Sequence, residues 1–335
     1  MKKNKVLAPG LVYVRDKWKE QPDESTLNKL KNRLEKVVDL NAFIPKDIME
    51  LKDAVRDAKI IIGGVKATEE LLGEAEKLEM IQNIGVGFDN IDVEACTERG
   101  VIVCNVAEIY SEPVAQHALG LILSLTKKIT RADRDMRAGI WQAQDWMGYQ
   151  IWGKTLGVVG LGNIGSRVAL KGRLAFGMKV LAYDPYIHPA RAQLFGAELV
   201  GLERLLREAD IVVLCVPLNQ ETHHLIGEEQ LSTMKKTAYL VNVCRGPIVD
   251  QEALIKCLQN EEIMGAGLDV HEIEPLPVNS PLLKMDNVVL TPHIASSTRK
   301  AVNETFDGAV SNVIRYIKGE KPFWIVNSEA YKKGR

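Results

Sequence analysis

The stretch 155–184 constrains the fold more than any other part of the chain. It starts with a short apolar run that leads directly into Gly160, Gly162 and Gly165, in the spacing G-x-G-x-x-G. The apolar run predicts a buried parallel strand, and glycines at its end predict a tight turn into a helix, expected over 166–176. The stretch therefore predicts a strand, a helix and a second strand that belong to a doubly wound parallel sheet.

Each part of this stretch suits the binding of a dinucleotide. Gly160 allows the tight turn, Gly162 lets the backbone approach a pyrophosphate, and Gly165 lets the helix pack closely on the strand. The pyrophosphate would lie at the helix N-terminus, where free N–H groups and the helix dipole favour anions. Glycines alone could form only a tight connection, but Asp184 follows the next apolar run, 19 residues after Gly165. A carboxylate there accepts hydrogen bonds from the adenosine ribose, so the combination favours a dinucleotide site.

Asp184 also indicates which of the two cofactors, NAD or NADP, the site would bind. A carboxylate at Asp184 repels the 2'-phosphate of NADP, and the next residues, 185–187, supply no arginine that could bind this phosphate. We therefore expect NAD as the cofactor.

Composition and charge exclude several other classes of protein. The chain has 335 residues, is 46% hydrophobic and 26% charged, and has a net charge of −1. This length predicts two domains, and the balanced charge gives no indication of binding to nucleic acid or to an anionic membrane. The apolar runs are far shorter than the ~20 residues of a membrane span. The basic start of the chain is not followed by a signal-peptide core.

The cysteines indicate a reducing compartment. There are five, at Cys96, Cys104, Cys215, Cys244 and Cys257. Their odd number, wide spacing and lack of a C-x-x-C motif are typical of reduced thiols and not of a disulfide framework or a zinc site. We therefore expect a cytoplasmic protein without a metal.

Short apolar runs alternate with charged helical stretches before the glycine motif. The expected strands there are 12–14, 37–38, 60–62, 80–84 and 101–104. The expected helices are 24–35, 46–57, 69–78 and 93–99. This alternation predicts a parallel sheet flanked by helices. Because the region has no glycine motif, we expect the main nucleotide site elsewhere.

Residues 111–131 are predicted to form one long helix. Ser111 is the expected cap, Pro113 lies in the first turn, and apolar residues recur at helical spacing. The following segment, 139–152, contains three tryptophans, Trp141, Trp146 and Trp152. Tryptophans in a loop are typical of an interface, although packing in a core is the alternative for at least one of them.

The alternation continues after the glycine motif. The expected strands are 211–216, 238–243, 265–270 and 287–290. The helices include 251–260, opened by Asp250, and a last helix over 298–318. Residues 155–291 thus supply enough strands for a complete nucleotide-binding domain. The tail 322–327 is expected to form a strand that joins another part of the molecule.

Residues just after these strands are candidates for chemistry, because ligands of open α/β sheets bind beyond the carboxyl ends of the strands. Such positions hold Arg245, Glu274 and His293. A hydride can leave a 2-hydroxy acid only if the hydroxyl proton is taken at the same time, which suits histidine near neutral pH. A carboxylate would orient the imidazole, and an arginine would bind the substrate carboxylate. Taken singly, each residue also has a structural alternative. Arg245 could form a surface ion pair, Glu274 could begin a turn, and His293 could cap the end of a strand.

Six motifs occur along the chain in a fixed order: NIGVGFDNID (83–92), VVGLGNIG (158–165), CVPL (215–218), VNVCRGPIVD (241–250), GLDVHEIEP (267–275) and LTPHIASS (290–297). Through them the chain resembles the D-isomer-specific 2-hydroxyacid dehydrogenase family over nearly its whole length. The resemblance implies two doubly wound α/β domains. A Rossmann NAD-binding domain, 106–295, would be inserted into a flavodoxin-like substrate-binding domain, 1–105 and 296–335.

The resemblance also implies the site residues. Arg245, Glu274 and His293 would be catalytic, with His293 as acid/base, and the amides of Val86 and Gly87 would bind the substrate carboxylate together with Arg245. The expected cofactor-binding residues are Gly160, Gly162, Asn163, Ile164, Gly165, Asp184, Pro217, Thr222, Val243, Cys244 and Asp269. Asp184 would bind the adenosine ribose, and Asp269 the nicotinamide carboxamide. Family members usually form homodimers through the nucleotide domain, which implies a role for 139–152 at that interface.

Departures from the family pattern narrow the function. Cys244 replaces a smaller residue, and its position beside Arg245 suggests a thiol of low pKa. The resemblance to phosphite dehydrogenase at Cys244 does not extend to Val86, where that enzyme has lysine, and Glu274 differs from the glutamine of formate dehydrogenases. His271 replaces a usual phenylalanine. The regulatory C-terminal domain of longer phosphoglycerate dehydrogenases is not expected.

The expected activity is reduction of a small 2-keto acid such as glyoxylate or hydroxypyruvate by hydride transfer to C2. One alternative keeps this chemistry and takes 3-phosphoglycerate as the substrate. A second alternative is an NAD-sensing binding protein similar to the co-repressors that share this fold.

Overall fold

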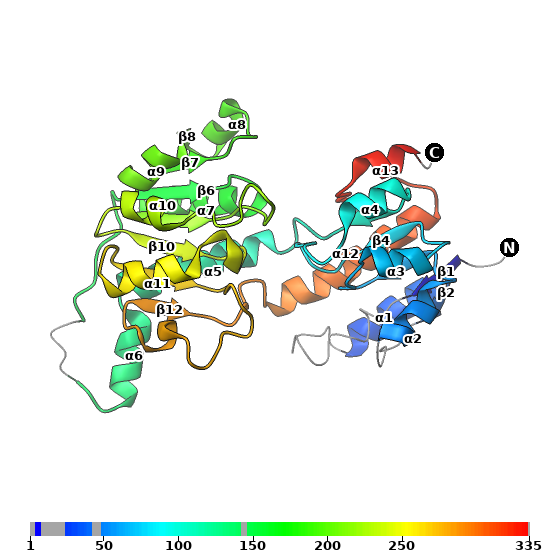
Figure 1. Ribbon diagram of the computed structural model, residues 1–335, viewed down its shortest axis with the longest axis horizontal. Coiled ribbons are helices and arrows are strands. Elements are labelled where there is room, and N and C mark those ends of the chain that lie inside the picture. The colour runs from blue at the N-terminus through cyan, green and yellow to red at the C-terminus, as the bar shows by residue number, and fades with distance from the viewer. Residues whose placement is uncertain (1–3, 8–23, 42–47, 142–145, 334–335) are drawn as a thin grey trace. The chain divides into compact units, whose positions relative to one another are not determined.

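The protein is described by a computed structural model, in which residues 4–7, 24–41, 48–141 and 146–333 are placed. The chain divides into two compact units, Met1–Tyr110 with Ser297–Arg335, and Ser111–Ser296 (Figure 1). Each unit contains one parallel sheet covered by helices on both faces. The predicted fold class, a pair of doubly wound α/β domains of which one is inserted into the other, is confirmed.

The first unit is built on five parallel strands in the order β2-β1-β3-β4-β5. They are β1 (Asn4–Leu7), β2 (Val38–Asn41), β3 (Ile60–Ile62), β4 (Met80–Gln82) and β5 (Ile102–Cys104). This is the strand order of flavodoxin-like sheets. Every residue of β3, β4 and β5 is buried, as expected of strands that helices cover on both faces.

The helices of the first unit are α1 (Glu24–Glu35), α2 (Ile48–Val55), α3 (Glu69–Glu74), α4 (Val93–Glu98), α12 (Arg299–Ile317) and α13 (Ser328–Lys333). Successive strand residues point to opposite faces, so Ile60 and Ile62 pack with α1 and α12, whereas Ile61 packs with α2, α3 and α4. Although α1 and α12 are distant in sequence, they lie side by side, and Arg33 donates to Ser311 over 2.9 Å. The last predicted helix is confirmed.

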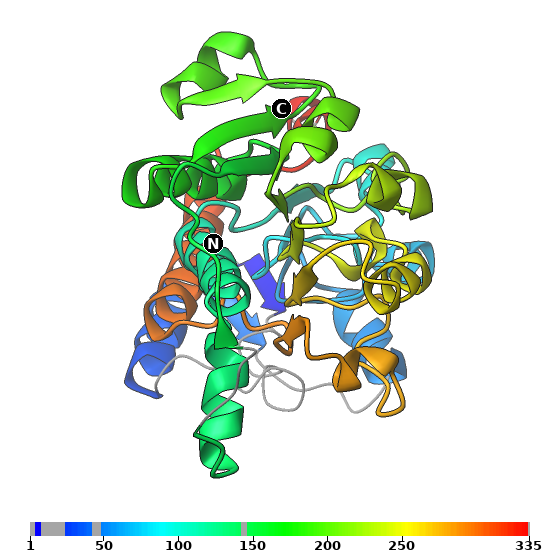
Figure 2. The same ribbon diagram turned by 90° about the vertical axis from the view of Figure 1, so that its left-hand side faces the viewer.

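The second unit has seven parallel strands in the order β12-β11-β10-β9-β6-β7-β8 (Figures 1 and 2). They are β6 (Thr155–Val159), β7 (Lys179–Tyr183), β8 (Ala197–Leu199), β9 (Ile211–Leu214), β10 (Tyr239–Asn242), β11 (Gly265–Leu268) and β12 (Val288–Leu290). The first six of these strands have the Rossmann order, and β12 extends the sheet. Of these seven strands only β8 was not predicted, and in the first unit β1 was not predicted.

The helices of the second unit are α5 (Ser111–Thr126), α6 (Ile129–Arg137), α7 (Asn163–Phe176), α8 (Pro189–Leu194), α9 (Leu202–Glu208), α10 (Glu228–Thr233) and α11 (Gln251–Gln259). Helices α9, α10 and α11 pack on the face that contains Ala266 and Leu268 of β11. Gly267, between these two residues, faces the other side, where Leu121 and Leu125 of α5 lie against it. The sheet is therefore covered on both faces.

The prediction of one helix over 111–131 was wrong. α5 ends at Thr126, Lys128 is left-handed with φ 53°, and α6 begins at Ile129. The carbonyl of Thr126 accepts the N–H of Tyr149 over 2.7 Å, and a Cβ on Gly148 would lie 2.6 Å from that carbonyl oxygen. The segment around Gly148 therefore takes the carbonyl that the next helical turn would need.

Two other predicted strands have different outcomes. Residues 12–14 lie outside the described residues. The tail 322–327 forms an isolated antiparallel bridge between Ile325 and Cys104 in place of a strand, and Val326 N–H donates to the carbonyl of Val103 over 2.8 Å. The tail therefore pairs with the end of β5 through a single bridge.

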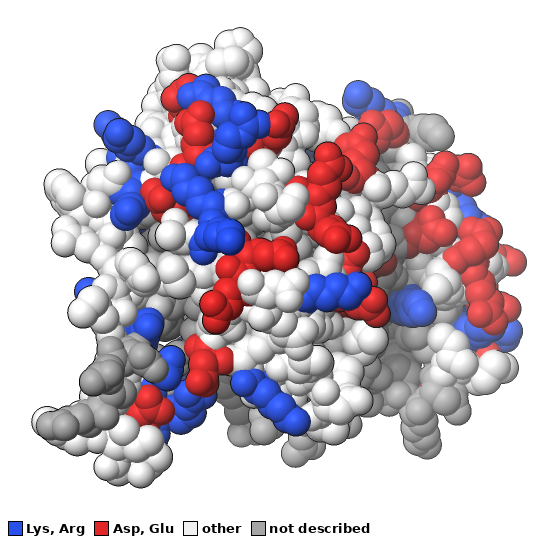
Figure 3. Space-filling model, turned by 60° about the vertical axis from the view of Figure 1, so that its left-hand side comes forward, with Lys and Arg blue, Asp and Glu red and all other residues white. Residues whose placement is uncertain are grey.

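The surface carries charges of both signs side by side. On the face shown in Figure 3, basic and acidic side chains are interspersed. Arg204, for example, donates to both Glu198 and Glu208 over 2.8 Å. No helix within the described ranges is long and apolar enough to cross a membrane.

Candidate active site

The glycine motif forms the turn between β6 and α7. Gly160 has φ +89°, and a Cβ there would lie 2.7 Å from the Cys215 carbonyl oxygen. A Cβ on Gly165 would lie 1.9 Å from the Gly160 carbonyl oxygen, whereas a Cβ on Gly162 would meet nothing within 4 Å. The fold itself therefore requires glycine at positions 160 and 165. Gly162 borders open space, so packing within the protein does not require glycine there.

The start of α7 presents unpaired donors. Gly162 is the N-cap of the helix, and the N–H groups of residues 162–165, which include Asn163 and Ile164, make no hydrogen bond with any described part of the chain. The first N–H groups of a helix have no partner within it, and they attract anions. The turn therefore fits the pyrophosphate of a dinucleotide.

Asp184 stands directly after β7 and is fixed beside this turn. Its Oδ2 accepts the N–H of Leu161 over 2.9 Å, and its Oδ1 accepts the N–H of Tyr186 over 3.0 Å. The hydroxyl of Tyr186 donates to Glu221 in the loop after β9. Two carboxylates, Asp184 and Glu221, thus flank the glycine turn, because β6 lies between β7 and β9 in the sheet.

Further predicted cofactor residues follow β9 and β10. Thr222 Oγ1 donates to the Pro217 carbonyl over 2.6 Å and accepts the Asn219 N–H over 2.9 Å, which closes a tight loop. Val243 and Cys244 come directly after β10 and are both buried. β9 lies next to β6 and β10 lies next to β9, all parallel, so all four predicted residues lie at the same edge of the sheet as the glycine turn.

The hypothesis of a low-pKa thiol at Cys244 was wrong. Burial raises the pKa of the Cys244 thiol to about 11, and this effect outweighs nearby backbone N–H groups and the positive charge of Arg245. The thiol donates to Asn242 Oδ1 over 3.1 Å. Cys244 is therefore a buried packing residue and not a reactive thiolate.

His293 and Glu274 form a hydrogen-bonded pair. His293 Nδ1 lies 2.8 Å from Glu274 Oε2, and the other carboxylate oxygen accepts the backbone N–H of His271 over 3.0 Å. Because a carboxylate only accepts, Nδ1 carries the proton of this hydrogen bond, and Nε2 is the second ring nitrogen, which can exchange a proton. Burial alone would raise the pKa of the Glu274 carboxyl, but the hydrogen bonds from His293 and His271 lower it. Glu274 is therefore held as a carboxylate.

Arg245 is placed by contacts around Gly246. The Arg245 carbonyl accepts from Asn242 Nδ2 over 2.8 Å. A Cβ on Gly246 would lie 1.9 Å from the carbonyl oxygen of His271, so the backbone after Arg245 packs directly on the segment that leads to Glu274. The structure thus brings the backbone segments of two predicted catalytic residues into contact.

The Asp269 side chain, which follows directly after β11, is completely buried. Its carboxylate accepts the Thr291 hydroxyl over 2.6 Å and the N–H groups of Ile294 and Ala295 over 2.9 Å each. Burial raises the pKa of Asp269, but hydrogen bonds from His117 and Thr291, together with these N–H groups, bring it below its ordinary value. Contact between Asp269 and the nicotinamide carboxamide stays a prediction.

Val86 and Gly87 lie in the first unit, in the loop after β4. Asn83 Nδ2 donates to the Gly87 carbonyl over 2.7 Å, and Asn105 Nδ2 donates to the Val86 carbonyl over 2.9 Å. The N–H groups of Val86 and Gly87 form no hydrogen bond within the described ranges. The loop carbonyls are therefore bound internally while the amides are left for a ligand.

Four residues at these sites were missed by sequence reasoning: Asn83, Asn105, His117 and Thr291. Asn105 follows directly after β5, so its place at a strand end could have identified it. Thr291 could have been found from its position two residues before His293. His117 gave no signal, because it lies within the apolar pattern of α5.

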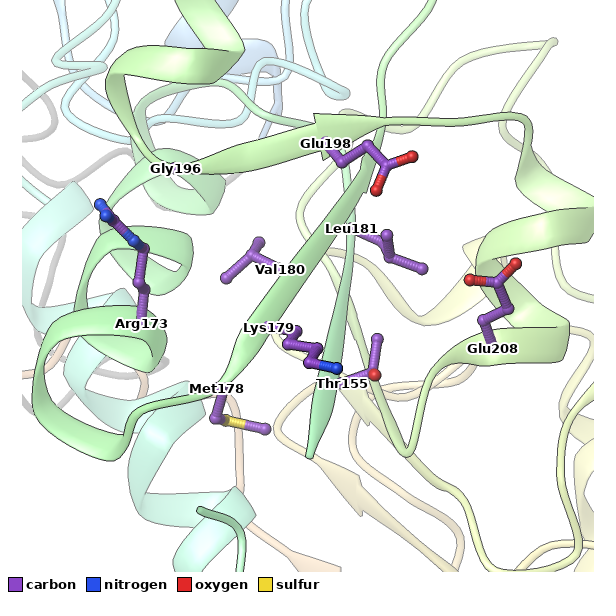
Figure 4. Close-up of a pocket in the computed structure, with 9 residues that line it drawn as sticks. All are labelled: Thr155, Arg173, Met178, Lys179, Val180, Leu181, Gly196, Glu198 and Glu208. Carbon is purple, nitrogen blue, oxygen red and sulfur yellow. The ribbon is translucent and has the colours of Figure 1, made fainter. Parts of the chain in front are cut away.

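A pocket at the other edge of the sheet is unrelated to these residues. Figure 4 shows its lining, which is Thr155, Arg173, Met178, Lys179, Val180, Leu181, Gly196, Glu198 and Glu208. Thr155 and Lys179 are the first residues of β6 and β7, so the pocket lies at the amino ends of these strands. None of the predicted site residues lines it.

Comparisons with known proteins agree with this geometry. The family model described as D-isomer specific 2-hydroxyacid dehydrogenase, NAD binding domain, matches residues 119–295. Glyoxylate reductase of Korarchaeum cryptofilum is 44% identical over 268 residues, covering 78% of this chain and 80% of that protein. D-3-phosphoglycerate dehydrogenase of Methanocaldococcus jannaschii is 41% identical over 281 residues, covering 83% of this chain and 53% of that protein.

Solved structures show the same similarity. D-lactate dehydrogenase of Aquifex aeolicus, complexed with NAD and lactic acid, superposes with a TM-score of 0.80 at 31% identity over 98% of both chains. The predicted family, the NAD cofactor and the oxidoreductase class are confirmed. The chain belongs to the D-isomer specific 2-hydroxyacid dehydrogenase family and is an NAD-dependent oxidoreductase that acts on 2-hydroxy and 2-keto acids.

Proposed function

We propose that this enzyme reduces glyoxylate or a similarly small 2-keto acid, with Arg245, Glu274 and His293 as the catalytic residues. The observation that carries the proposal is the 2.8 Å hydrogen bond between His293 Nδ1 and Glu274, which orients the imidazole and stabilises its protonated form. A nicotinamide in its reduced form, when bound, supplies the hydride. The protein then has to protonate the oxygen at C2 and hold the substrate carboxylate.

His293 protonates this oxygen from Nε2. Glu274 stabilises the imidazolium that must form first, and it fixes the ring orientation through Nδ1. Arg245 has the planar, bidentate donor geometry that matches a carboxylate next to the reacting carbonyl. The pair in this structure therefore supplies the acid, and the arginine supplies the anchor.

The loop at Val86 and Gly87 is proposed as a second anchor for the substrate carboxylate. Successive unpaired N–H groups form a concave anion site, and this loop has them because its carbonyls accept from Asn83 and Asn105. In the proposed division of labour, Ser111–Ser296 is the NAD-binding domain, and the unit that contains Val86 is the substrate-binding domain.

The proposed cofactor residues fall into three groups. Gly162, Asn163 and Ile164, with the close-packed glycines on either side, would receive the pyrophosphate at the start of α7. Asp184 would accept the ribose hydroxyls with the lone pairs that Leu161 and Tyr186 leave free. The remaining predicted residues, Pro217, Thr222, Val243, Cys244 and Asp269, would border the rest of the dinucleotide.

The substrate proposal is tested by the loss of NADH absorbance with a panel of 2-keto acids. The panel contains glyoxylate, hydroxypyruvate, pyruvate and 3-phosphohydroxypyruvate. We expect the highest kcat/KM with glyoxylate or hydroxypyruvate, because Val86 brings no cation to the loop for a phosphate. A preference for 3-phosphohydroxypyruvate would contradict this choice and favour the phosphoglycerate dehydrogenase alternative.

A homodimer is proposed from the apolar surface of α6 and the segment that follows it. Large side chains exposed there are Ile129, Met136, Ile140, Trp141, Met147, Tyr149 and Trp152. Helix α6 extends away from the sheet of its unit (Figures 1 and 2), and several large exposed apolar side chains in one stretch of chain are typical of interfaces. Light scattering should show a dimer for the wild type and monomer for Met147→Glu. Leu194→Glu, at an exposed site on α8, is the control, and a monomeric wild type would contradict the proposal.

A cytoplasmic location is also proposed. It is supported by the five cysteines, which are all free thiols in the structure. Fractionation of cells that express the protein at its natural level would test it.

A further inference from the structure

The turn that carries His293 has a backbone conformation that needs support. His293 has φ 55°, in the left-handed region that is costly for residues with a Cβ. Its N–H donates to the carbonyl of Asp269 over 2.7 Å, and the next two N–H groups donate to the Asp269 carboxylate over 2.9 Å each. Asp269 thus holds three successive N–H groups of the catalytic turn.

The Asp269 carboxylate is in turn held from α5. The Thr291 hydroxyl donates to Asp269 Oδ1 over 2.6 Å, and His117 Nε2 lies 2.9 Å from the same hydroxyl oxygen and 3.4 Å from Oδ1. Thr291 has one hydroxyl proton, which it gives to Asp269, so it can only accept from His117. His117 Nε2 therefore carries a proton and donates it.

This second imidazole and carboxylate pair is more buried than the first. The Asp269 side chain is 1% exposed and His117 is 22% exposed, compared with 36% for Glu274 and 27% for His293. Without the donor at His117 the Thr291 hydroxyl can turn away from Asp269, and a buried carboxylate that loses a donor recovers hydrogen bonds by moving. Movement of Asp269 would shift the N–H groups that fix the backbone at His293.

We propose that His117 is a positioning residue, which holds His293 in its catalytic orientation by donating Nε2–H to Thr291 and so fixing the Asp269 carboxylate. The inference rests on the proposed acid/base role of His293. It assigns His117 no contact with substrate or cofactor. Its effect should fall mainly on the proton-transfer step, and cofactor binding should change only through the predicted contact of Asp269 with the nicotinamide.

The test compares His117→Phe, which keeps a ring and removes the donor, with His117→Gln, whose side-chain amide can donate from near the Nε2 position. We expect His117→Phe to lower kcat about tenfold, the effect of leaving a buried group without its hydrogen bond. The dissociation constant for NADH should rise by a smaller factor than kcat falls, because the glycine turn is untouched and only the predicted nicotinamide contact of Asp269 is disturbed. The solvent deuterium isotope effect on kcat should rise, because delivery of the proton becomes slower. His117→Gln should recover most of the lost rate.

A matched control lies one residue away on the same helix. Gln116 is exposed and donates to Glu112 over 2.8 Å, away from the Thr291 hydroxyl, so Gln116→Ala should keep the wild-type rate. If His117→Phe does not fold, Thr291→Val and Thr291→Ser provide the same contrast, because only the serine keeps the hydroxyl. The double variant His117→Phe/Thr291→Val should lose little more than either single variant, since both act through Asp269.

The positioning role is overturned if His117→Phe keeps its kcat within about twofold of wild type, or if His117→Gln is as slow as His117→Phe. It is also overturned if the affinity of His117→Phe for NADH falls by as large a factor as its kcat. His293→Ala is measured beside these variants to separate the two proposals. An inactive His293→Ala with a normal His117→Phe refutes only the positioning role, whereas an active His293→Ala refutes the proposed function itself.

Discussion

In each of the two sheets, one strand is followed by a loop whose backbone N–H groups have no partner among the described residues, but the two loops achieve this by different means. After β6, the N–H groups of residues 162–165 lack such a partner because they begin a helix, and Gly160 and Gly165 permit the close packing of that turn. After β4, the loop at Val86 has no helix to supply such groups. Its carbonyls are instead bound by Asn83 and Asn105.

The difference shows two ways in which a chain can leave successive N–H groups unpaired: by starting a helix, or by binding the loop carbonyls with side chains. Glycine spacing belongs to the first kind and is visible in the sequence as a motif. The second kind depends on asparagine side chains that reach back over the loop, one of them from the end of a different strand. The two loops should therefore respond to different substitutions.

The largest effect is expected from the glycine turn itself. Gly165→Ala places a Cβ 1.9 Å from a carbonyl oxygen, and such overpacking costs about 3 kcal/mol and lowers the thermal midpoint by about 10 °C. Gly162→Ala meets nothing within 4 Å. It should keep the midpoint and weaken NADH binding about tenfold, because the Cβ occupies space needed for the pyrophosphate. Differential scanning fluorimetry and NADH fluorescence titration check both, and equal midpoints for the two variants would contradict the assignment.

The second largest effect concerns the acid beside this turn. Asp184→Ala removes one negative charge from the place where NADP carries its 2'-phosphate. A repulsion of about 2 kcal/mol corresponds to an about 30-fold fall in the ratio of kcat/KM for NADH to that for NADPH. Asp250→Ala, which removes the cap of α11, is the control. An unchanged ratio in Asp184→Ala would place the discrimination elsewhere, with Glu221 as the next carboxylate to replace.

A substitution that disturbs the loop after β4 should change only the affinity for the substrate. Asn105→Leu removes the donor to the Val86 carbonyl, and the reoriented loop should raise the KM for the keto acid about tenfold. NADH affinity should not change. Asn327→Leu is the matched control, because Asn327 is a buried asparagine of the same unit that bonds Val103 N–H and not the loop. A rise in KM for both variants, measured by steady-state kinetics, would indicate general destabilisation of the unit.

The smallest effect concerns the negative charge of Glu274, the carboxylate that is hydrogen-bonded to His293. The pKa of Glu274 is lowered in the folded protein from an ordinary value of 4.5. Its interactions therefore stabilise the fold fully above pH 4.5, and this contribution is lost as the pH falls through the lowered folded value. Urea unfolding at neutral pH should show Glu274→Gln less stable by under about 1 kcal/mol, since the pair is partly exposed. The difference should vanish in acid, and a difference that is independent of pH would refute the charge argument.

The sequence predicted the parts of this structure that depend on neighbours in the chain. The glycine turn, the cap at Asp250 and the start of the last helix at Thr298 all follow from residues within a few positions. The His293 and Glu274 pair could also be predicted, because both residues follow strands that the alternation of apolar runs identified. Each of these features depends on local backbone chemistry or on the shared edge of a parallel sheet.

The remaining features depend on contacts between distant residues. The long helix over 111–131 breaks because the Thr126 carbonyl bonds Tyr149, and nothing near Thr126 indicates that contact. The pKa of Cys244 is set by burial, which its neighbour Arg245 does not reveal. His117 and Thr291 are 174 positions apart, so their hydrogen bond is visible only in the folded chain.

The most direct test of the account is the rate of NADH oxidation by glyoxylate in the wild type and in His293→Ala. His188→Ala serves as control, since His188 caps α8 and is none of the proposed site residues. We predict that His293→Ala keeps its NADH affinity and loses about 1,000-fold in kcat, the effect of removing a general acid, while the control keeps both. A His293→Ala enzyme that retains kcat within about tenfold of wild type would contradict the assignment of His293 as the proton donor.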